Sequence, residues 1–238
     1  MELILCEVAD GEYGLRSLSP FCEKAHRALY FHGLEYTRKH GGRPSHHKQY
    51  NPSGQVPVLL IDGQPVPDST AILIKLEELS DKTLLPATPA ECGEAWAWEE
   101  FGDSVIGQYI PVARWLDERH WPLNKHYYSA GAPKLLKGFI ENLVRKNVGK
   151  AYAKRDVLKQ GMDAAWKEFE RHLDNLEARA PATGFWMGDA LTVADIGLFS
   201  CIQELRIPTT PWHRDRINEH ATLAGWLDRV DAATADKY

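Results

Sequence analysis

Residues 17–33 read SLSPFCEKAHRALYFHG and predict a loop that turns into a helix. Ser19 can cap the helix N-terminus, Pro20 suits the first helical position, and Gly33 is a typical stop signal. Unpaired N–H groups and the positive end of the helix dipole favour an anion at such a start. The stretch therefore indicates a site for a sulfur anion, supplied either by Cys22 or by a bound thiol. The plainer alternative is an ordinary helix cap followed by a small buried cysteine.

Strand patterns lie on both sides of this helix. Four segments have the composition or alternation of strands, and they are residues 2–8, 34–40, 56–61 and 64–67. Asp62-Gly63 predicts a hairpin turn between the last two, and Asp68 begins a second helix. Residues 81–89 are rich in turn residues and read as a linker. The order predicts an α/β domain with a mixed four-stranded sheet over residues 1–80.

Beyond the linker, strand signals nearly vanish, so residues 90–238 predict an all-helical domain. Helical patterns cover residues 90–116, 134–180, 191–206 and 222–233. Pro111 should interrupt the first of them, and residues 117–133 are expected to be irregular. Thr192 and Asp195 have the spacing of a capping box, which predicts a structural helix start.

Composition narrows the function classes. The formal charge of −5 over 238 residues argues against nucleic acid or a membrane as the main partner. The four cysteines form no CxxC pair, which fits a reducing compartment and gives no metal signature; they are Cys6, Cys22, Cys92 and Cys201. No signal peptide or membrane span is recognisable. We therefore expect a cytoplasmic protein without a metal.

Two further motifs could bind an extended peptide. If the bond before Pro57 is cis, Val56 could offer its main-chain N–H and C=O to a peptide ligand. The plainer interpretation is a proline at a strand edge. Ser69 and the N–H groups at the helix start could hold a carboxylate, and Asp68 an amine. Asp68 also predicts a helix cap, and the two roles are compatible.

Four histidines could in principle bind a metal ion, but a contact to a bound ligand is the better interpretation. The candidates are His40, His46, His47 and His120. His46 and His47 are adjacent, so their side chains do not easily converge, and no acidic residue stands at ligand spacing. A contact from His47 or Lys48 to a ligand carboxylate is the more plausible role.

The motifs share an order and a spacing. Ser19-Pro20-Phe21 at the first helix is followed by Asn51-Pro-Ser-Gly-Gln-Val-Pro57, by Asp68-Ser69, and by the sequence Leu-Thr-Val-Ala-Asp that ends at Asp195. In this the chain resembles the cytosolic glutathione transferase family. The resemblance implies a thioredoxin-like N-terminal domain that binds glutathione. It also implies a helical C-terminal domain that helps form the second-substrate pocket, and a homodimer.

Position by position, the resemblance implies site residues. Ser19 matches the catalytic Ser or Cys, Ser17 is the nearby alternative, and Cys22 is a third candidate. Omega-like and glutaredoxin-like members carry cysteine where Ser19 stands, whereas this chain has it three residues later. Val56 before a cis Pro57 matches the residue that pairs with the cysteinyl backbone of glutathione, and Asp68 and Ser69 match the γ-glutamyl site. The implied binding residues are Phe21, Lys48, Gln55, Val56, Pro57, Asp68 and Ser69.

Three functional hypotheses follow. In the first, glutathione sulfur is transferred to a small hydrophobic electrophile while the Ser19 hydroxyl donates to the thiolate. Candidate electrophiles are halogenated aromatics, α,β-unsaturated carbonyls, aryl ethers and organic peroxides. In the second, Cys22 performs glutathione-dependent thiol–disulfide exchange. In the third, the chain is a non-catalytic glutathione-binding or scaffold protein that keeps the fold.

Overall fold

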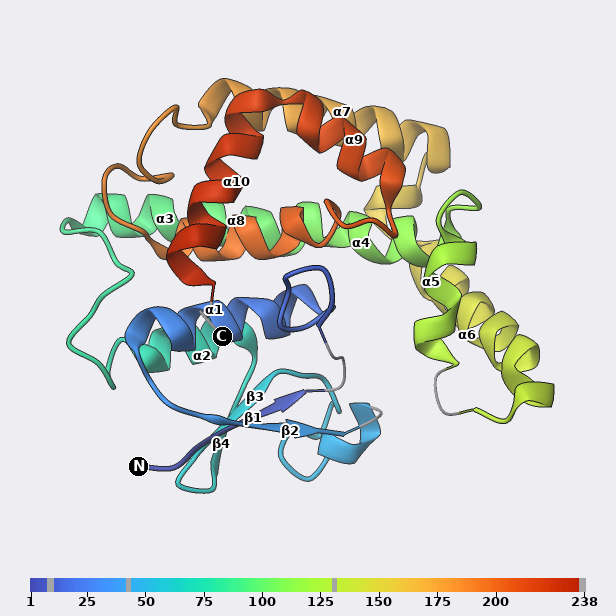
Figure 1. Ribbon diagram of the computed structural model, residues 1–238, viewed down its shortest axis with the longest axis horizontal. Helices are drawn as coiled ribbons and strands as arrows, with labels where there is room; N and C mark the ends of the chain where they lie inside the picture. The colour runs from blue at the N-terminus through green and yellow to red at the C-terminus, as the bar shows by residue number, and fades with distance from the viewer. Residues whose placement is uncertain (8–10, 42–43, 130–131, 236–238) are drawn as a thin grey trace.

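The computed structural model describes residues 1–7, 11–41, 44–129 and 132–235. Its N-terminal part holds a four-stranded sheet of order β2-β1-β3-β4 (Figure 1). The strands are β1 (Leu3–Glu7), β2 (Thr37–His40), β3 (Val58–Ile61) and β4 (Gln64–Pro67). β1 runs parallel to β2 and antiparallel to β3, and β3 and β4 form the predicted hairpin. The sheet is therefore mixed, and this part of the chain is thioredoxin-like, as predicted.

Two helices separate the sheet from the rest of the molecule (Figure 1). They are α1 (Pro20–His32) and α2 (Ser69–Leu76). α1 begins after Ser19 and ends at Gly33, whose φ of 69° is the left-handed conformation that suits glycine. The Ser19 side chain occupies the N-cap position but makes no capping hydrogen bond. α1 is buried along most of its length because it contacts both the α/β layer and the helical half.

The C-terminal half is helical, as predicted. Its helices are α3 (Pro89–Ser104), α4 (Tyr109–Pro111), α5 (Trp121–Tyr128), α6 (Lys137–Tyr152), α7 (Met162–Arg179), α8 (Val193–Gln203), α9 (Pro211–Glu219) and α10 (Ala221–Thr234). The prediction that residues 117–133 are irregular is wrong, because α5 lies there. α9 falls in a segment for which no helix was predicted. Both are short helices with weak apolar periodicity, and tertiary packing decides them.

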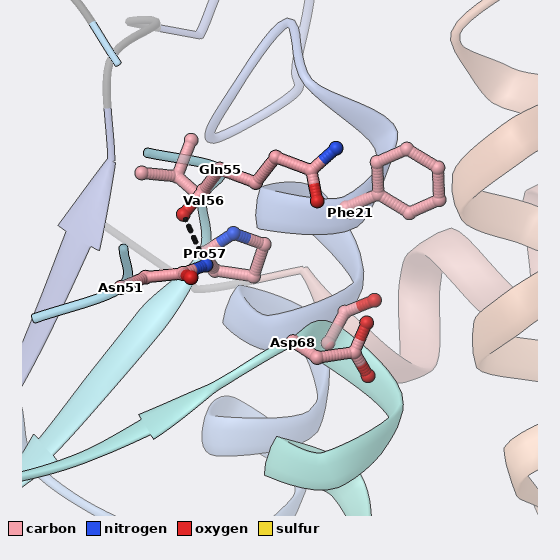
Figure 2. Close-up of a pocket in the computed structure, with 7 residues that line it drawn as sticks. Phe21, Asn51, Gln55, Val56, Pro57 and Asp68 are labelled. Atoms are coloured by element: carbon pink, nitrogen blue, oxygen red, sulfur yellow. Dashed lines mark hydrogen bonds between the residues drawn. The ribbon is translucent and has the colours of Figure 1, made fainter. Parts of the chain in front are cut away.

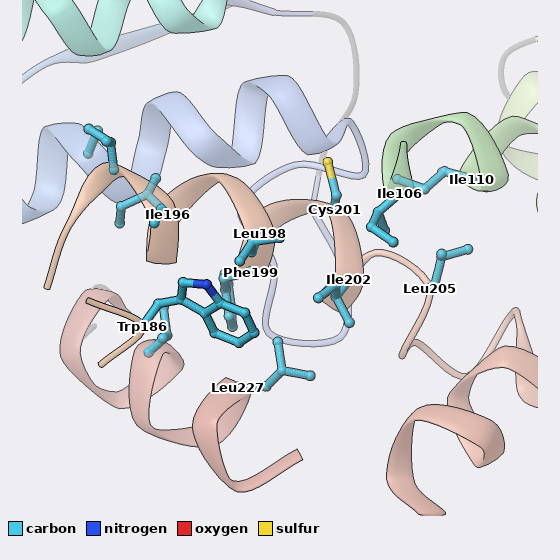
Figure 3. Close-up of a cluster of buried hydrophobic side chains, with 14 of the residues drawn as sticks. Ile106, Ile110, Trp186, Ile196, Leu198, Phe199, Cys201, Ile202, Leu205 and Leu227 are labelled. Atoms are coloured by element: carbon cyan, nitrogen blue, oxygen red, sulfur yellow. The ribbon is translucent and has the colours of Figure 1, made fainter. Parts of the chain in front are cut away.

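α8 forms the centre of the helical half (Figure 3). Residues 193–202 are all buried, so this helix has no polar face. It packs against α1, α3 and α10. Its crossing with α3 is very close, since a Cβ atom added to Gly102 would lie 2.9 Å from the carbonyl carbon of Gly197. The predicted capping box is present at its start, between Thr192 and Asp195.

A buried lysine joins the two halves. Lys24 of α1 is 1% exposed, and its Nζ donates to Glu99 Oε1 at 2.5 Å and Asp103 Oδ2 at 2.6 Å, both on α3. It also donates to the hydroxyl of Thr70 in α2, at 3.2 Å. The Thr70 hydroxyl in turn donates to Glu99 Oε1 at 2.7 Å. This network fixes α1, α2 and α3 relative to one another.

A buried histidine predicts acid sensitivity. His213 of α9 is packed among Trp166, Phe169 and Trp212, and its two ring nitrogens lack a hydrogen-bond partner within the described ranges. Burial lowers the pKa of His213 well below its usual value, with the nearby His120 acting in the same direction. The native state therefore keeps this ring neutral, whereas the unfolded chain binds a proton below about pH 6.5.

Stability should consequently fall as the pH drops below this value. From pH 7 to pH 5, His213 alone should reduce the free energy of unfolding by at most about 2 kcal/mol, the limit set by proton uptake in the unfolded chain. His213→Phe keeps an aromatic ring in the site and should remove this part of the pH dependence. Denaturant titrations of both proteins at the two pH values measure the difference. Equal pH slopes for wild type and variant would contradict the assignment.

Candidate active site

A cavity of about 280 Å³ lies where the start of α1, the turn before β3 and the start of α2 meet (Figure 2). Its lining residues are Phe21, Asn51, Gln55, Val56, Pro57, Asp68 and Ser69. Six of the seven carry a predicted contact to glutathione, although they come from three separate segments of the sequence. Asn51 is the residue that sequence reasoning missed as part of the site.

Asn51 shapes the turn that precedes the cavity's Gln55 and Val56. Its side-chain Nδ2 donates to the Gln55 carbonyl at 3.0 Å, the contact drawn as a dashed line in Figure 2. Its Oδ1 accepts from the N–H and hydroxyl of Ser53, at 3.2 and 2.9 Å. An Asn at the start of a turn commonly makes such local bonds. The Val56–Pro57 peptide bond is cis, as the family resemblance implies.

Asp68 and Ser69 form the opposite side of the cavity. Asp68 Oδ1 caps α2 by accepting from the N–H groups of Thr70 and Ala71, at 2.9 and 3.0 Å. The backbone φ of Asp68 is 83°, a conformation that few residues other than glycine adopt. Such an outlier beside a cavity is a typical feature of functional sites. The cap uses Oδ1 alone, so the carboxylate can cap the helix and also face a ligand amine.

The three sulfur-site candidates differ in exposure. Cys22 is fully buried, and burial raises the pKa of its thiol to about 12, although hydrogen bonding from Ser19 and Ser17 acts in the opposite direction. A neutral thiol with no exposed surface is a poor nucleophile, which argues against the predicted catalytic role of Cys22. Ser17 is also fully buried, and its Oγ accepts from the Ser19 N–H at 3.2 Å.

Ser19 is the partly exposed member of the three. It lies directly before the first turn of α1, two residues before Phe21, but does not itself line the described cavity. Phe21 connects the site with the helical half, because its Cζ lies 4.0 Å from the position of a Cβ on Gly107. The wall of the cavity formed by Phe21 therefore lies beside the segment between α3 and α4.

The other predicted contacts lie elsewhere. Lys48 is exposed and does not line the cavity. His47 is buried, and its Nε2 is 2.9 Å from the carbonyl oxygen of Glu7, which is a structural contact. Across the described residues, no group of three potential ligands could hold a metal ion. None of the helices in those same ranges has the length and apolar character needed to cross a membrane.

Comparison with known proteins agrees with this fold. A model of the glutathione S-transferase N-terminal domain matches residues 18–79, and a model of the C-terminal domain matches residues 159–235. Protein LigF of Sphingobium sp. (strain NBRC 103272 / SYK-6) is 28% identical over 242 residues, covering 94% of this chain and 88% of LigF. The two domain models together match more than half of the chain, which therefore belongs to the glutathione S-transferase family of enzymes.

Solved structures show the same fold. The crystal structure of beta-etherase LigF from Sphingobium sp. strain SYK-6 has a TM-score of 0.69 and 23% identity, covering 98% of this chain and 96% of that one. A glutathione S-transferase from Methylobacillus flagellatus KT, solved with glutathione bound, has a TM-score of 0.62 and 15% identity, with 99% and 100% covered. Glutathione is thus a ligand of proteins with this fold.

Proposed function

We propose that this protein transfers the sulfur of glutathione to a small hydrophobic electrophile, with Ser19 stabilising the thiolate. The observation that carries the proposal is the cavity, which joins Val56 and Pro57 to the capped helix start at Asp68 and Ser69. Such a cavity suits an extended tripeptide with a carboxylate and an amine at one end. Phe21 in its wall lies beside the start of α1, so a thiol in the middle of the peptide can reach Ser19.

Ser19 would act on the nucleophile. Its hydroxyl donates a hydrogen bond to the sulfur, and the N-terminus of α1 adds a positive potential, so the thiol pKa of bound glutathione falls. More of the bound glutathione is then thiolate at neutral pH, and the thiolate is the attacking species. The thiol proton passes to solvent. The S–C bond forms as the leaving group departs with its electron pair.

An ether is the electrophile we favour. LigF, to which this chain is similar, is described as a beta-etherase. On an ether the thiolate attacks the carbon next to the oxygen, the C–S bond forms, and the C–O bond breaks. The oxygen leaves as an alkoxide or phenoxide and takes a proton from solvent. The phenyl ring of Phe21 offers an apolar wall for an aromatic substituent.

Thiol–disulfide exchange through Cys22 is disfavoured by the burial of that thiol. A non-catalytic scaffold keeping only the fold would not need the intact cavity. Three expectations stay predictions: that the protein is a homodimer, that it is cytoplasmic, and that its two domains end at residue 80 and begin at residue 90.

Ser19→Ala tests the mechanism. We expect kcat for an aryl ether or another electrophile to fall by roughly 10- to 100-fold, the range of a charge-assisted hydrogen bond. The KM for glutathione should change little, because the cavity residues are intact. The thiol pKa of bound glutathione, followed by the ultraviolet absorbance of the thiolate, should rise by at least about one unit. A variant with wild-type kcat and thiol pKa would refute the role of Ser19.

A further inference from the structure

The loop that leads into α1 is held by arginine side chains at alternate carbonyl groups. Leu18 O accepts from Arg114 at 2.7 Å, Arg16 O from Arg38 at 2.8 Å, and Gly14 O, more weakly, from Arg27 at 3.4 Å. Each of these arginines is also paired with a carboxylate; the pairs are Arg114–Glu204, Arg38–Glu7 and Arg27–Glu23. The contact at Leu18 is the one next to Ser19.

The peptide group between Leu18 and Ser19 is held at both ends. Its carbonyl accepts from Arg114, and its N–H donates to Ser17 Oγ at 3.2 Å. Ser17 is itself fixed, since its own N–H donates to Glu23 Oε2 at 3.0 Å. A peptide plane restrained on both sides fixes the direction in which the Ser19 side chain leaves the backbone. The Ser19 side chain makes no capping bond, and within the described ranges its side-chain interaction is with the Cys22 thiol in the first turn of α1.

Arg114 comes from the other half of the molecule. It lies on the π-helical segment Val112–Leu116, which follows α4, and is 4% exposed. One of its terminal nitrogens donates to Leu18, and the other donates to both the main-chain oxygen (2.6 Å) and the carboxylate of Glu204, just after α8. The guanidinium therefore bridges the helical core and the backbone beside Ser19. π-helical segments inside α-helices often occur at functional sites.

Stability alone does not explain this buried pair. Removing two charges from water costs several kcal/mol each, and apolar residues of similar size are often as stable or more stable in such positions. The Arg114 guanidinium has two terminal nitrogens, one bonded to the Leu18 carbonyl and the other to the Glu204 carboxylate. Such a planar fork is suited to holding the backbone beside Ser19 in one position. A shift of about 1 Å at a catalytic group can reduce the rate by about a hundredfold.

We propose that Arg114 is a positioning residue that acts through Ser19, aligning its hydroxyl with the sulfur of bound glutathione. The inference rests on the function proposed above for Ser19. It adds that the helical half sets the geometry of the thiolate site through the guanidinium of Arg114.

The double variant Arg114→Met/Glu204→Met tests this, because it removes both buried charges together and leaves neither unpaired. We expect the thiol pKa of bound glutathione to rise by about one unit and kcat to fall about tenfold. The KM for glutathione should stay within about twofold, since the cavity is untouched. Arg114→Lys is the second variant: it keeps a charge for Glu204 but lacks the fork, and we expect the same direction of change.

Two comparisons make the result specific. Arg229→Met is the matched control, because Arg229 also donates to loop carbonyls. It bonds Gly184 O at 3.0 Å and Pro181 O at 2.5 Å, and neither it nor these two residues line the cavity. It should leave the thiol pKa and kcat unchanged. In a Ser19→Ala background, the Arg114→Met/Glu204→Met pair should cause no further loss of kcat, because its effect passes through Ser19.

The outcomes separate the inference from the proposed function. If Ser19→Ala lowers kcat but folded Arg114→Met/Glu204→Met and Arg114→Lys proteins keep the wild-type thiol pKa and kcat, the positioning role is wrong and the proposed function stands. If Ser19→Ala has no effect, the proposed function fails first. Additive losses in the combined variant would show that Arg114 acts by another route and would also overturn the inference.

Discussion

Asp195→Ala should lower the free energy of unfolding by about 4 kcal/mol, because one carboxylate satisfies several buried donors. Asp195 is fully buried at the start of α8. Its Oδ1 accepts from the Trp186 N–H at 2.7 Å and from the Trp226 indole at 2.9 Å. Its Oδ2 accepts from the N–H and hydroxyl of Thr192, both at 2.9 Å. Alanine leaves these donors without an acceptor, and each buried unsatisfied donor costs about 1–3 kcal/mol.

Urea denaturation followed by tryptophan fluorescence measures the loss of unfolding free energy, since Trp186 and Trp226 both donate to Asp195. Asp189→Ala is the matched control: Asp189 lies in the segment just before α8 but is exposed, and its replacement should change the free energy by no more than about 0.5 kcal/mol. Equal effects of the two substitutions would mean that the Asp195 bonds contribute nothing beyond those of a surface carboxylate.

Lys24→Met should destabilise the protein by about 3–5 kcal/mol, the usual cost of breaking a buried ion pair by removing one partner. The substitution leaves Glu99, 1% exposed, and Asp103, 15% exposed, without their cation. Lys24→Met/Glu99→Gln removes one of the two stranded charges and should recover a large part of the loss. Lys75→Met is the control, because the Lys75–Glu78 pair is exposed and worth less than about 1 kcal/mol.

The loss caused by Lys24→Met should also depend on pH. Burial already raises the pKa of Asp103 to about 6, against the opposing charge of Lys24. Without Lys24 this pKa rises further above its unfolded value, so the native variant gains protons more readily than the unfolded chain as the pH falls. The difference in unfolding free energy between wild type and Lys24→Met should therefore shrink from pH 8 to pH 5. A difference that does not change with pH would count against buried carboxylates as its cause.

Local signals in the sequence were enough for the N-terminal fold. Ser19-Pro20, Asp62-Gly63 and Asp68 each act within a few residues, so the helix starts and the hairpin are legible in the chain itself. The cavity residues also follow, because their order and spacing match a family. Whether Cys22 is a reactive thiol cannot be read from the sequence, because its burial depends on the packing around it and not on its neighbours in the chain.

Long-range pairs account for what the sequence does not show. Lys24 looks like an ordinary helix residue until α3 brings Glu99 and Asp103, 75 and 79 positions away, onto its ammonium group. Arg114 reaches Leu18 across 96 positions. No periodicity or short motif encodes such contacts. Asn51 is a milder case, because its turn is evident in the sequence while its place in the cavity wall depends on the fold.

The close crossing of α3 and α8 restricts how this protein can change over evolutionary time. A methyl group at position 197 would lie 2.8 Å from Glu99 Cγ and 2.9 Å from Glu99 Cα, so even alanine at this position pushes α3 away. Glu99 is the residue that receives Lys24, which means that the push would reach α1 and the site at its start. Glycine at position 197 thus sets the spacing of α3 and α8 within the helical half, and a larger residue there would first disturb the Lys24 network that holds α1.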